Sequence, residues 1–369
     1  MNVDRANIVI IGGGVVGTAI ALAASAMWDD VFLLEAMPKL GMGASSRNSG
    51  VIHSGLYYAP GSLKARLCVT GNPLLYEFAA SHGIPHRRSG KLVVATSEAE
   101  IGDLESLMEN GRKNGVGGLR IVDRARIRQL EPHIEAVAAI EVPSTGIVMA
   151  EELVKGYARL ATERGANIVT GAPVERIEPT AGGLRVSSAA GEIETRCVVN
   201  SAGLFADEVA RMIGNQRYQI YPVRGEYGEL VRAKSHLLGG LVYPLPRRDG
   251  LSLGIHLTRT LWGTVLIGPT ARYVEDKNDY ERDREPAENF ATYARHLLPE
   301  VEPADVVLSY SGLRAKLLPP GTSGHPDFVI EHDPEFPALI HLVGIESPGL
   351  TASLAIANSV VPMIRHALT

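Results

Sequence analysis

The pattern of apolar positions at the start of the chain predicts a strand, a helix and a second strand. The β-branched run Asn7–Ile11 is typical of a buried strand, and residues 15–27 have the alanine-rich face of a packed helix. Val31–Glu35 is a second apolar run, and it ends in an acid. This order is typical of a βαβ unit that binds a dinucleotide.

Glycines between the first strand and the helix suit a pyrophosphate. Gly12 permits a tight turn, Gly14 lets the backbone approach the phosphates, and Gly17 lets the helix pack closely on the strand. Glu35 follows Gly14 by roughly 20 residues, a spacing that suits a hydrogen bond to a ribose hydroxyl. We expect the dinucleotide to contact Gly12, Gly14, Val15, Val16, Gly17, Glu35 and Ala36.

A signal peptide or a transmembrane helix is the competing interpretation of this segment. No charged residue occurs from Ala6 to Trp28, and Arg5 precedes the run. The three glycines at 12–14 would weaken such a helix, and cleavage near Ala26 would remove the segment that explains Glu35. We therefore expect no transmembrane segment and a cytoplasmic protein, with peripheral contact at the inner membrane face as a further option.

Two later apolar strands favour FAD over NAD. Residues 196–203 predict a buried strand with a small-residue turn, and residues 339–344 predict another, followed by a helix from about Leu350 to His366. The N-terminus of that helix would offer N–H groups to a flavin carbonyl. A nucleotide fold built from three separated parts of the chain is typical of large FAD enzymes. The further FAD contacts that we expect are Val174, Ala202, Gly203, Pro348, Gly349, Leu350 and Thr351.

The pattern changes in the rest of the chain and predicts a second domain. From Gln219 to about Leu317, alternating strands (one of them Leu251 to His256) predict an antiparallel sheet, with a helix at about residues 285–298. Short strands at 167–170, 174–177 and 184–187 are expected to cap the nucleotide domain. The predicted fold is α/β: a discontinuous Rossmann-like FAD-binding domain (1–85, 140–215 and 320–369) and an antiparallel-sheet substrate domain (86–139 and 216–319).

Composition narrows the possible partners. The 369 residues, 45% of them hydrophobic, are enough for two domains. A net charge of −5 gives no basic surface for nucleic acid. Cys68 and Cys197 are too few for a disulfide framework or a cysteine-rich metal site, and no histidine pair has convincing ligand spacing. We expect neither a metal nor a nucleic-acid partner.

The segment Gly41–Cys68 is too polar and too rich in glycine for a simple core element. It brings several cations, a histidine and two tyrosines into one short stretch, a set that would suit a small anionic substrate beside a flavin. A surface loop followed by an ordinary helix is the alternative. We expect its first part, Ser45, Ser46, Arg47, Asn48 and Ser49, to hold the cofactor, and the part from His53 to Arg66 to face the substrate.

The chain resembles the family of L-2-hydroxyglutarate dehydrogenases and oxidases, within the D-amino-acid-oxidase-like (DAO) group of FAD oxidoreductases. The resemblance covers nearly the whole chain and is most specific at Asn48–Cys68. It continues in order at Val223–Tyr227, Leu241–Pro244, Gly254–Thr258, Ile267–Pro269 and Ser311–Ala315. The chain departs from the family at Arg47, where a histidine is common, and at Gly344–Thr351, where the family motif is usually close to Asn-Ala-Pro-Ser-Pro-Ala-Ala-Thr.

The resemblance implies oxidation of an L-2-hydroxy acid, 2-hydroxyglutarate or a similar small dicarboxylate, with hydride transfer to flavin N5. A base must take the hydroxyl proton, and His53 and His256 are the candidates because both lie in matching motifs. An amino-acid or amine oxidase, a glycerol-3-phosphate dehydrogenase and a non-catalytic flavoprotein are the alternatives. The electron acceptor is left open between oxygen, a quinone and a partner flavoprotein.

The carboxylates of such a substrate need cationic partners. Arg314 matches the position where related flavoenzymes place a carboxylate-binding arginine. We expect Gly312 and Arg314 to contact the cofactor as well. Lys64 either holds a distal carboxylate or is solvated on its helix. Tyr57 and Tyr243 either donate hydrogen bonds to substrate oxygens or are core tyrosines.

Overall fold

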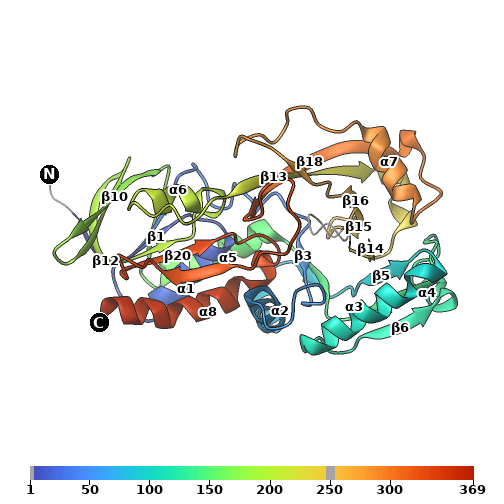
Figure 1. The fold of residues 1–369 in the computed structure, drawn as a ribbon, viewed down its shortest axis with the longest axis horizontal. Helices are drawn as coiled ribbons and strands as arrows, with labels where there is room; N and C mark the ends of the chain where they lie inside the picture. Colours follow the sequence, from blue (N-terminus) through green and yellow to red (C-terminus); the bar gives the residue numbers. More distant parts are fainter. Residues whose placement is uncertain (1–3, 247–253) are drawn as a thin grey trace.

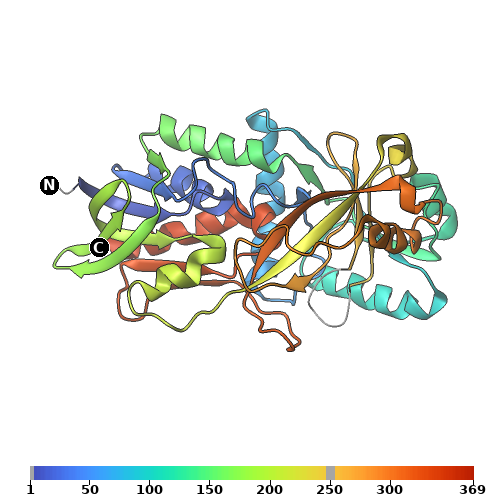
Figure 2. The same cartoon turned by 90° about the horizontal axis from the view of Figure 1, so that it is seen from above.

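The computed structural model describes residues 4–246 and 254–369, which form two lobes along the long axis of the molecule (Figure 1; Figure 2). Both chain ends belong to one lobe, and the middle of the chain forms much of the other (Figure 1). Each lobe is built on one large sheet. The mixed α/β fold expected from the sequence is therefore present.

The first sheet has a parallel centre. In the described residues it has eight strands, and its main path runs β10-β11-β12-β1-β2-β9. Strand β1 pairs in parallel with β12 and β2, and β20 and β9 extend the parallel part on either side. Apolar side chains cover both faces of these strands, as the uninterrupted apolar runs predict. The strands are β1 (Asp4–Ile11), β2 (Val31–Glu35), β9 (Asn167–Thr170), β10 (Val174–Thr180), β11 (Gly183–Ser188), β12 (Gly191–Asn200), β19 (Val329–His332) and β20 (Leu339–Val343).

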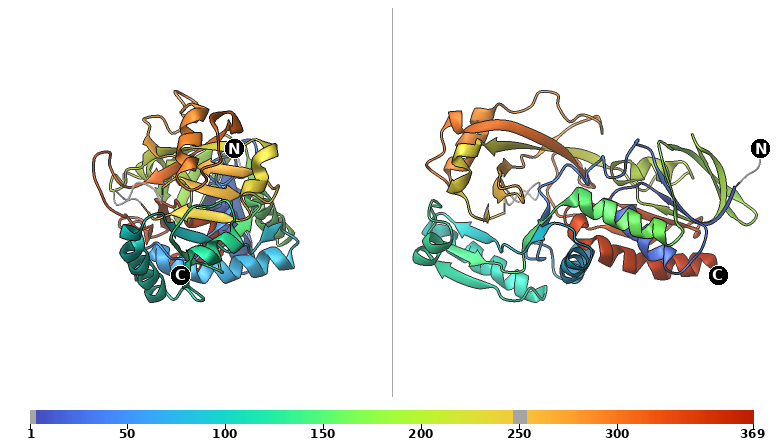
Figure 3. Two further views of the ribbon diagram at one scale, coloured as in Figure 1. Left: turned by 90° about the vertical axis from the view of Figure 1, so that its right-hand side faces the viewer. Right: turned by 180° about the vertical axis from the view of Figure 1, so that it is seen from behind.

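Helices pack against this sheet and enclose the larger core. Helix α1 (Val15–Ser25) contacts both α5 (Ala150–Glu163) and α8 (Gly349–Leu368), and α2 (Leu63–Ser81) packs on α8. The view from behind shows α1, α5 and α8 along one side of the lobe (Figure 3). Ser62 begins α2 by accepting a hydrogen bond from the Ala65 N–H at 3.1 Å.

The second sheet is mixed. Nine strands of the described chain build it, with the main path β17-β13-β16-β15-β14-β5-β7-β6 and β18 paired with β13. All its pairs are antiparallel except that of β14 with β5, which corrects the expectation of an antiparallel sheet. The strands are β5 (Leu92–Ala95), β6 (Arg120–Asp123), β7 (Ala138–Glu141), β13 (Tyr221–Leu230), β14 (Leu241–Pro244), β15 (His256–Arg259), β16 (Val265–Gly268), β17 (Arg272–Tyr273) and β18 (Val306–Lys316).

Smaller elements complete the fold. A three-stranded sheet consists of β3 (Val51–Ile52), β8 (Gly146–Val148) and β4 (His86–Arg87). The remaining helices are α3 (Ile101–Lys113), α4 (Arg124–Leu130), α6 (Ala206–Arg211), α7 (Ala287–Arg295), and the short 3-10 helices η1 (Glu98–Glu100), η2 (Gly203–Phe205), η3 (Arg232–Leu237) and η4 (Pro303–Asp305). Within the described ranges, we find no helix that is both long and apolar enough to cross a bilayer.

One local expectation is wrong, and another lies partly outside the described residues. The strands at 167–170, 174–177 and 184–187 do not cap the nucleotide domain, because β9, β10 and β11 continue its sheet. Of the predicted strand Leu251 to His256, positions 251–253 lie outside the described residues. Strand β15 begins at His256. We propose that the two large sheets are the cores of the two domains expected from the sequence.

Candidate active site

A cavity of about 1200 Å³ is lined by residues of both sheets. It extends from Gly12 and Glu35, at the ends of β1 and β2, to His256 on β15 and Arg314 on β18. Cavities for drug-sized ligands are roughly 300–1,000 Å³. The space is therefore large enough for a dinucleotide together with a small substrate.

One end of the cavity is formed by the start of α1. Gly12 has φ +102°, and a Cβ there would lie 2.6 Å from the Ser201 carbonyl oxygen, so the turn requires glycine. No side chain caps α1 at Gly14, and its first turn carries no acid. The Glu35 carboxylate accepts hydrogen bonds from the N–H groups of Gly13 at 2.6 Å and Met37 at 2.8 Å. A helix N-terminus beside a fixed carboxylate fits the phosphates and ribose of a dinucleotide.

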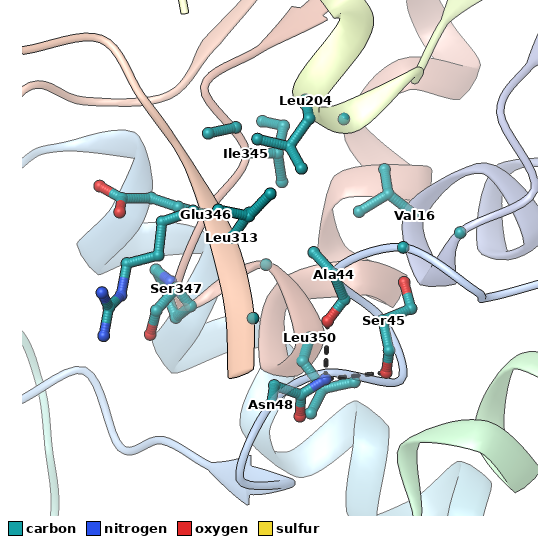
Figure 4. Close-up of a pocket in the computed structure, with 18 of the residues that line it drawn as sticks. Val16, Ala44, Ser45, Asn48, Leu204, Leu313, Ile345, Glu346, Ser347 and Leu350 are labelled. Carbon is teal, nitrogen blue, oxygen red and sulfur yellow. Dashed lines mark hydrogen bonds between the residues drawn. The ribbon is translucent and has the colours of Figure 1, made fainter. Parts of the chain in front are cut away.

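The turn that contains Ala44 to Asn48 forms the adjoining wall (Figure 4). The Asn48 side-chain amide donates to the carbonyl oxygens of Ala44 at 3.0 Å and Ser45 at 2.8 Å, which closes the turn. The Ser45 hydroxyl oxygen accepts from the Val15 N–H at 2.9 Å and so ties this turn to α1. Apolar side chains of Val16, Leu204, Leu313, Ile345 and Leu350 surround the same space (Figure 4). This combination suits a flat ring system held by backbone groups.

Arg47 joins this turn to β18. Its guanidinium donates to the Ser311 carbonyl at 3.3 Å and lies 4.2 Å from the centroid of the Tyr280 ring. A Cβ at Gly312 would come within 2.1 Å of the Arg47 carbonyl oxygen. Gly312 is thus required for the close approach of β18 to the 45–49 turn.

His53 is held in place by its backbone. Its N–H donates to the Thr351 hydroxyl at 2.9 Å, and its carbonyl accepts from the Asn72 amide at 2.9 Å. Its Nε2 lies 3.3 Å from the Ser347 hydroxyl, and its Nδ1 is buried without a partner in the described residues. Burial, and then the charge of Lys91, lowers the pKa of His53 to about 3. The imidazole is therefore neutral near neutral pH.

His256 and Tyr243 form one flat unit on neighbouring strands. Their rings stack with centroids 3.8 Å apart. Burial, followed by the charge of Lys91, lowers the pKa of His256 well below its usual value. The described residues offer no partner to His256 Nδ1, which is buried. The cavity therefore has a second neutral imidazole.

Three cationic side chains line the same cavity as these histidines. Arg314 donates to the Thr270 carbonyl at 3.2 Å. The Lys64 ammonium lies 2.9 Å from Glu346 Oε1, and Lys316 lies 3.3 Å from the same oxygen. Burial alone would raise the pKa of Glu346, but Lys64 and Lys316 hold it below its usual value. Lys64 is therefore paired rather than solvated.

Most of the predicted site residues line this one cavity. They are His53, Tyr57, Lys64, Tyr243, His256 and Arg314 among the predicted catalytic set, and Gly12, Gly14, Val15, Val16, Glu35, Ala36, Ser45, Arg47, Asn48, Ser49, Val174, Ala202, Gly203, Gly312, Pro348, Gly349 and Leu350 among the cofactor set.

Other predicted residues do not line the cavity. A Cβ at Gly17 would come within 1.9 Å of the Gly12 carbonyl oxygen, so Gly17 serves helix packing. Thr351 is buried and joins His53 to β3, and the Ser46 hydroxyl donates to the Gly43 carbonyl at 3.4 Å. Arg66 is exposed, which corrects the expectation that the segment up to Arg66 faces the substrate.

Three charged residues at or beside this cavity were not expected from the sequence: Glu346, Lys316 and Lys91. Glu346 falls where the chain departs from the family motif, and that departure was the available signal. Lys91 begins an apolar strand, where a lysine is seldom buried, so its position was a second signal. Among residues 4–246 and 254–369, no group of three or more His, Cys, Asp or Glu side chains is placed to hold a metal.

The chain matches a protein family along most of its length and is similar to two curated proteins. The family model described as FAD dependent oxidoreductase (DAO) matches residues 7–362. The mitochondrial L-2-hydroxyglutarate dehydrogenase of Arabidopsis thaliana is 35% identical, with 97% of this chain and 83% of the plant protein covered. The L-2-hydroxyglutarate dehydrogenase of Indibacter alkaliphilus is 32% identical, with 96% and 97% covered.

Solved structures with the same fold include two oxidases. The FAD-bound L-α-glycerophosphate oxidase of Mycoplasma pneumoniae matches with a TM-score of 0.90 and 26% identity, covering 98% of this chain and 95% of the other. The glycine oxidase of Geobacillus kaustophilus matches with a TM-score of 0.83 and 24% identity over the same shares. The second likeness concerns the fold alone.

Proposed function

The chain belongs to the family of FAD-dependent oxidoreductases, and from that premise we propose that it oxidises L-2-hydroxyglutarate to the 2-oxo acid. The observation that carries the proposal is the concentration of two neutral imidazoles and several cations in one cavity with a dinucleotide-type helix start. An alcohol with two carboxylates needs a neutral imidazole to take its hydroxyl proton and cations to bind its carboxylates.

The residues at the α1 end would hold FAD. Glu35 is placed for a ribose, the α1 N-terminus for the pyrophosphate, and the 44–49 turn with Gly349 and Leu350 for the ring system. Bound FAD supplies an acceptor for the hydride that leaves C2 of the substrate.

The chain's own residues handle the proton and the substrate charges. We assign the hydroxyl proton to the imidazole of His53 or His256, both of which are neutral and have an unpartnered nitrogen in the described structure. We assign binding of the carboxylate beside C2 to Arg314 and binding of the distal carboxylate to Lys64. Lys64 also forms an ion pair with Glu346. We assign Tyr57 and Tyr243, which line the cavity, as hydrogen-bond donors to substrate oxygens.

Glycerol-3-phosphate oxidation is the second candidate, because the Mycoplasma glycerophosphate oxidase shares the fold with 26% identity. A phosphate ester would also suit a cationic cavity. The presence of Arg314 and two lysines in one cavity does not by itself distinguish a carboxylate substrate from a phosphate ester. The higher identity to the L-2-hydroxyglutarate dehydrogenases favours the hydroxy acid.

Anaerobic reduction of the purified holoprotein tests the proposal. L-2-hydroxyglutarate, D-2-hydroxyglutarate, L-malate, glycerol 3-phosphate and glycine are added separately while the visible flavin absorbance is followed. We expect rapid bleaching with L-2-hydroxyglutarate and little with its D enantiomer. Bleaching by glycerol 3-phosphate or glycine alone would reject the hydroxy-acid assignment.

We also propose a cellular location and a set of electron acceptors for the protein. Several relatives are named mitochondrial, whereas the Indibacter relative is not. We propose a cytoplasmic location, with peripheral contact at the inner membrane face as a further option. Oxygen, a quinone or a partner flavoprotein is the proposed electron acceptor. Turnover with each acceptor, measured on membrane-free and membrane fractions, distinguishes them.

A further inference from the structure

Lys91 is a buried cation behind the cavity wall. It precedes β5, its residue is 3% exposed, and backbone hydrogen bonds with Val142 at 3.1 and 2.8 Å fix it between strands. No carboxylate pairs with it in the described parts of the chain. A buried charge without an acidic partner is costly, so its presence calls for a reason.

The Lys91 ammonium contacts two side chains that do line the cavity. It donates to the Tyr57 hydroxyl oxygen at 3.1 Å and lies 4.3 Å from the centroid of that ring. It also lies 4.5 Å from the centroid of the Tyr243 ring. His256 stacks on the same Tyr243 ring. Lys91 is not among the residues that line the cavity, whereas the two tyrosines that it contacts are.

The hydrogen bond from Lys91 determines what Tyr57 does. Since the hydroxyl oxygen accepts from the ammonium, its own proton is free to donate, and no acceptor for it is found among the described residues. Burial raises the pKa of Tyr57, so the hydroxyl keeps this proton. A cation behind a phenol makes that phenol a stronger donor.

We propose that Lys91 is a positioning residue for the substrate: it aims the Tyr57 hydroxyl proton into the cavity and supplies the positive charge that a bound carboxylate neutralises. This inference rests on the proposed oxidation of a hydroxy acid. It explains a buried lysine that has no acidic partner among residues 4–246 and 254–369, because the substrate itself supplies the counter-charge.

The groups that face Lys91 leave its charge uncompensated. They are Tyr57 and Tyr243 on the cavity wall, His53 and His256 beside them, and Cys68 on α2. Burial raises the pKa of both tyrosines and of the Cys68 thiol, and lowers that of both histidines, so all five are neutral near neutral pH. Burial also lowers the pKa of Lys91 to about 7. An anion in the cavity favours the charged form and should draw a proton onto Lys91.

Proton uptake on binding of glutarate, a dicarboxylate without the reacting hydroxyl, tests this role. Calorimetry of the holoprotein at pH 8 in buffers of different ionisation enthalpy gives the number of protons taken up. With a pKa near 7, most Lys91 is neutral at pH 8, so we expect uptake of close to one proton. The affinity should fall about tenfold for each pH unit above 7.

Three variants separate positioning from a structural role. Lys91→Met should lose both the proton uptake and the pH dependence, whereas Lys91→Arg should bind glutarate without uptake because arginine stays charged. Tyr57→Phe should keep the uptake and weaken glutarate binding. Lys155→Met, at an exposed lysine of α5 paired with Glu152, is the matched control and should behave as the native protein.

The outcomes are distinct. Unchanged uptake in Lys91→Met, or no uptake in the native protein, overturns the inference. If Lys91→Met does not retain FAD, the comparison of Lys91→Arg with the native protein decides by itself. Flavin bleaching by L-2-hydroxyglutarate is scored separately, so failure of the proposed reaction is recognised even where glutarate binding depends on Lys91.

Discussion

The imidazole of His256 lies flat against the phenol ring of Tyr243, with 3.8 Å between the ring centroids and 3° between the ring planes. This stack restrains His256, because rotation of either ring would lose the contact. His53 is restrained differently, through its backbone bonds to Thr351 and Asn72, while its Nε2 faces Ser347 at 3.3 Å. The two histidines are therefore suited to different tasks.

We predict that His53 is the base and that His256 mainly orients the substrate. His53→Gln should slow anaerobic flavin reduction by roughly 10²–10⁴-fold, the usual contribution of a general base. His256→Gln should chiefly raise KM. Stopped-flow reduction at saturating L-2-hydroxyglutarate measures both effects. A normal reduction rate in His53→Gln with a large loss in His256→Gln would reverse the assignment.

The pH profile of kcat/KM should fall on the alkaline side and not on the acid side between pH 5 and 7. The free-protein pKa of His53 is lowered to about 3, so its neutral, basic form is already complete at pH 5. Lys91 loses its proton above about pH 7, and substrate binding must then restore it. An acid limb near pH 6.5 would instead indicate an ordinary, unperturbed histidine.

Arg314→Lys should weaken substrate binding while leaving the fold intact. A lysine keeps the charge but not the planar pair of donors, and loss of a bidentate contact costs about 2–3 kcal/mol, or roughly 100-fold in KM. Steady-state kinetics with L-2-hydroxyglutarate measures the change. Arg159→Lys, at an exposed arginine of α5 paired with Glu163, is the control and should leave KM unchanged.

Gly312→Ala should reduce FAD affinity although Gly312 bears no chemistry. Its Cβ would meet the Arg47 carbonyl oxygen at 2.1 Å and would push β18 away from the 45–49 turn. We expect at least a tenfold higher dissociation constant for FAD, measured by recovery of flavin fluorescence. Gly182→Ala, where a Cβ meets nothing within 4 Å and which does not line the cavity, should retain FAD normally. Equal affinities in the two variants would show that β18 can move without cost.

The sequence predicts what is local and fails where contacts join distant segments. Gly12, Gly14 and Glu35 lie within one βαβ unit, so their spacing alone suggests a dinucleotide site. Lys64 and Glu346 are 282 positions apart, and no local sequence pattern predicts that their side chains are in contact. The parallel pairing of β14 with β5 is equally non-local, which is why the substrate sheet was expected to be antiparallel.

Glu346→Gln should lower the stability of the protein strongly, although it removes only one charge. The side chains of Lys64, Lys316 and Glu346 are 12%, 8% and 6% exposed, and Glu346 Oε1 lies within reach of both ammonium groups. Removing one partner of a buried ion pair costs about 3–5 kcal/mol, because a charge is left uncompensated. Glu152→Gln, in an exposed pair with Lys155, should cost about 0.5 kcal/mol or less.

The pH dependence of this loss has a definite sign. The pKa of Glu346 is lowered in the folded protein, so its stabilising effect is complete above the unfolded value of 4.5 and is lost as pH falls through the lowered folded value. Thermal melting of native protein and Glu346→Gln should therefore converge in acid and differ most near neutral pH. Adding Lys316→Met to Glu346→Gln should recover part of the stability, because it removes one of the two uncompensated ammonium groups. No recovery in the double variant would mean that hydrogen bonding by Glu346, rather than its charge, stabilises this wall of the cavity.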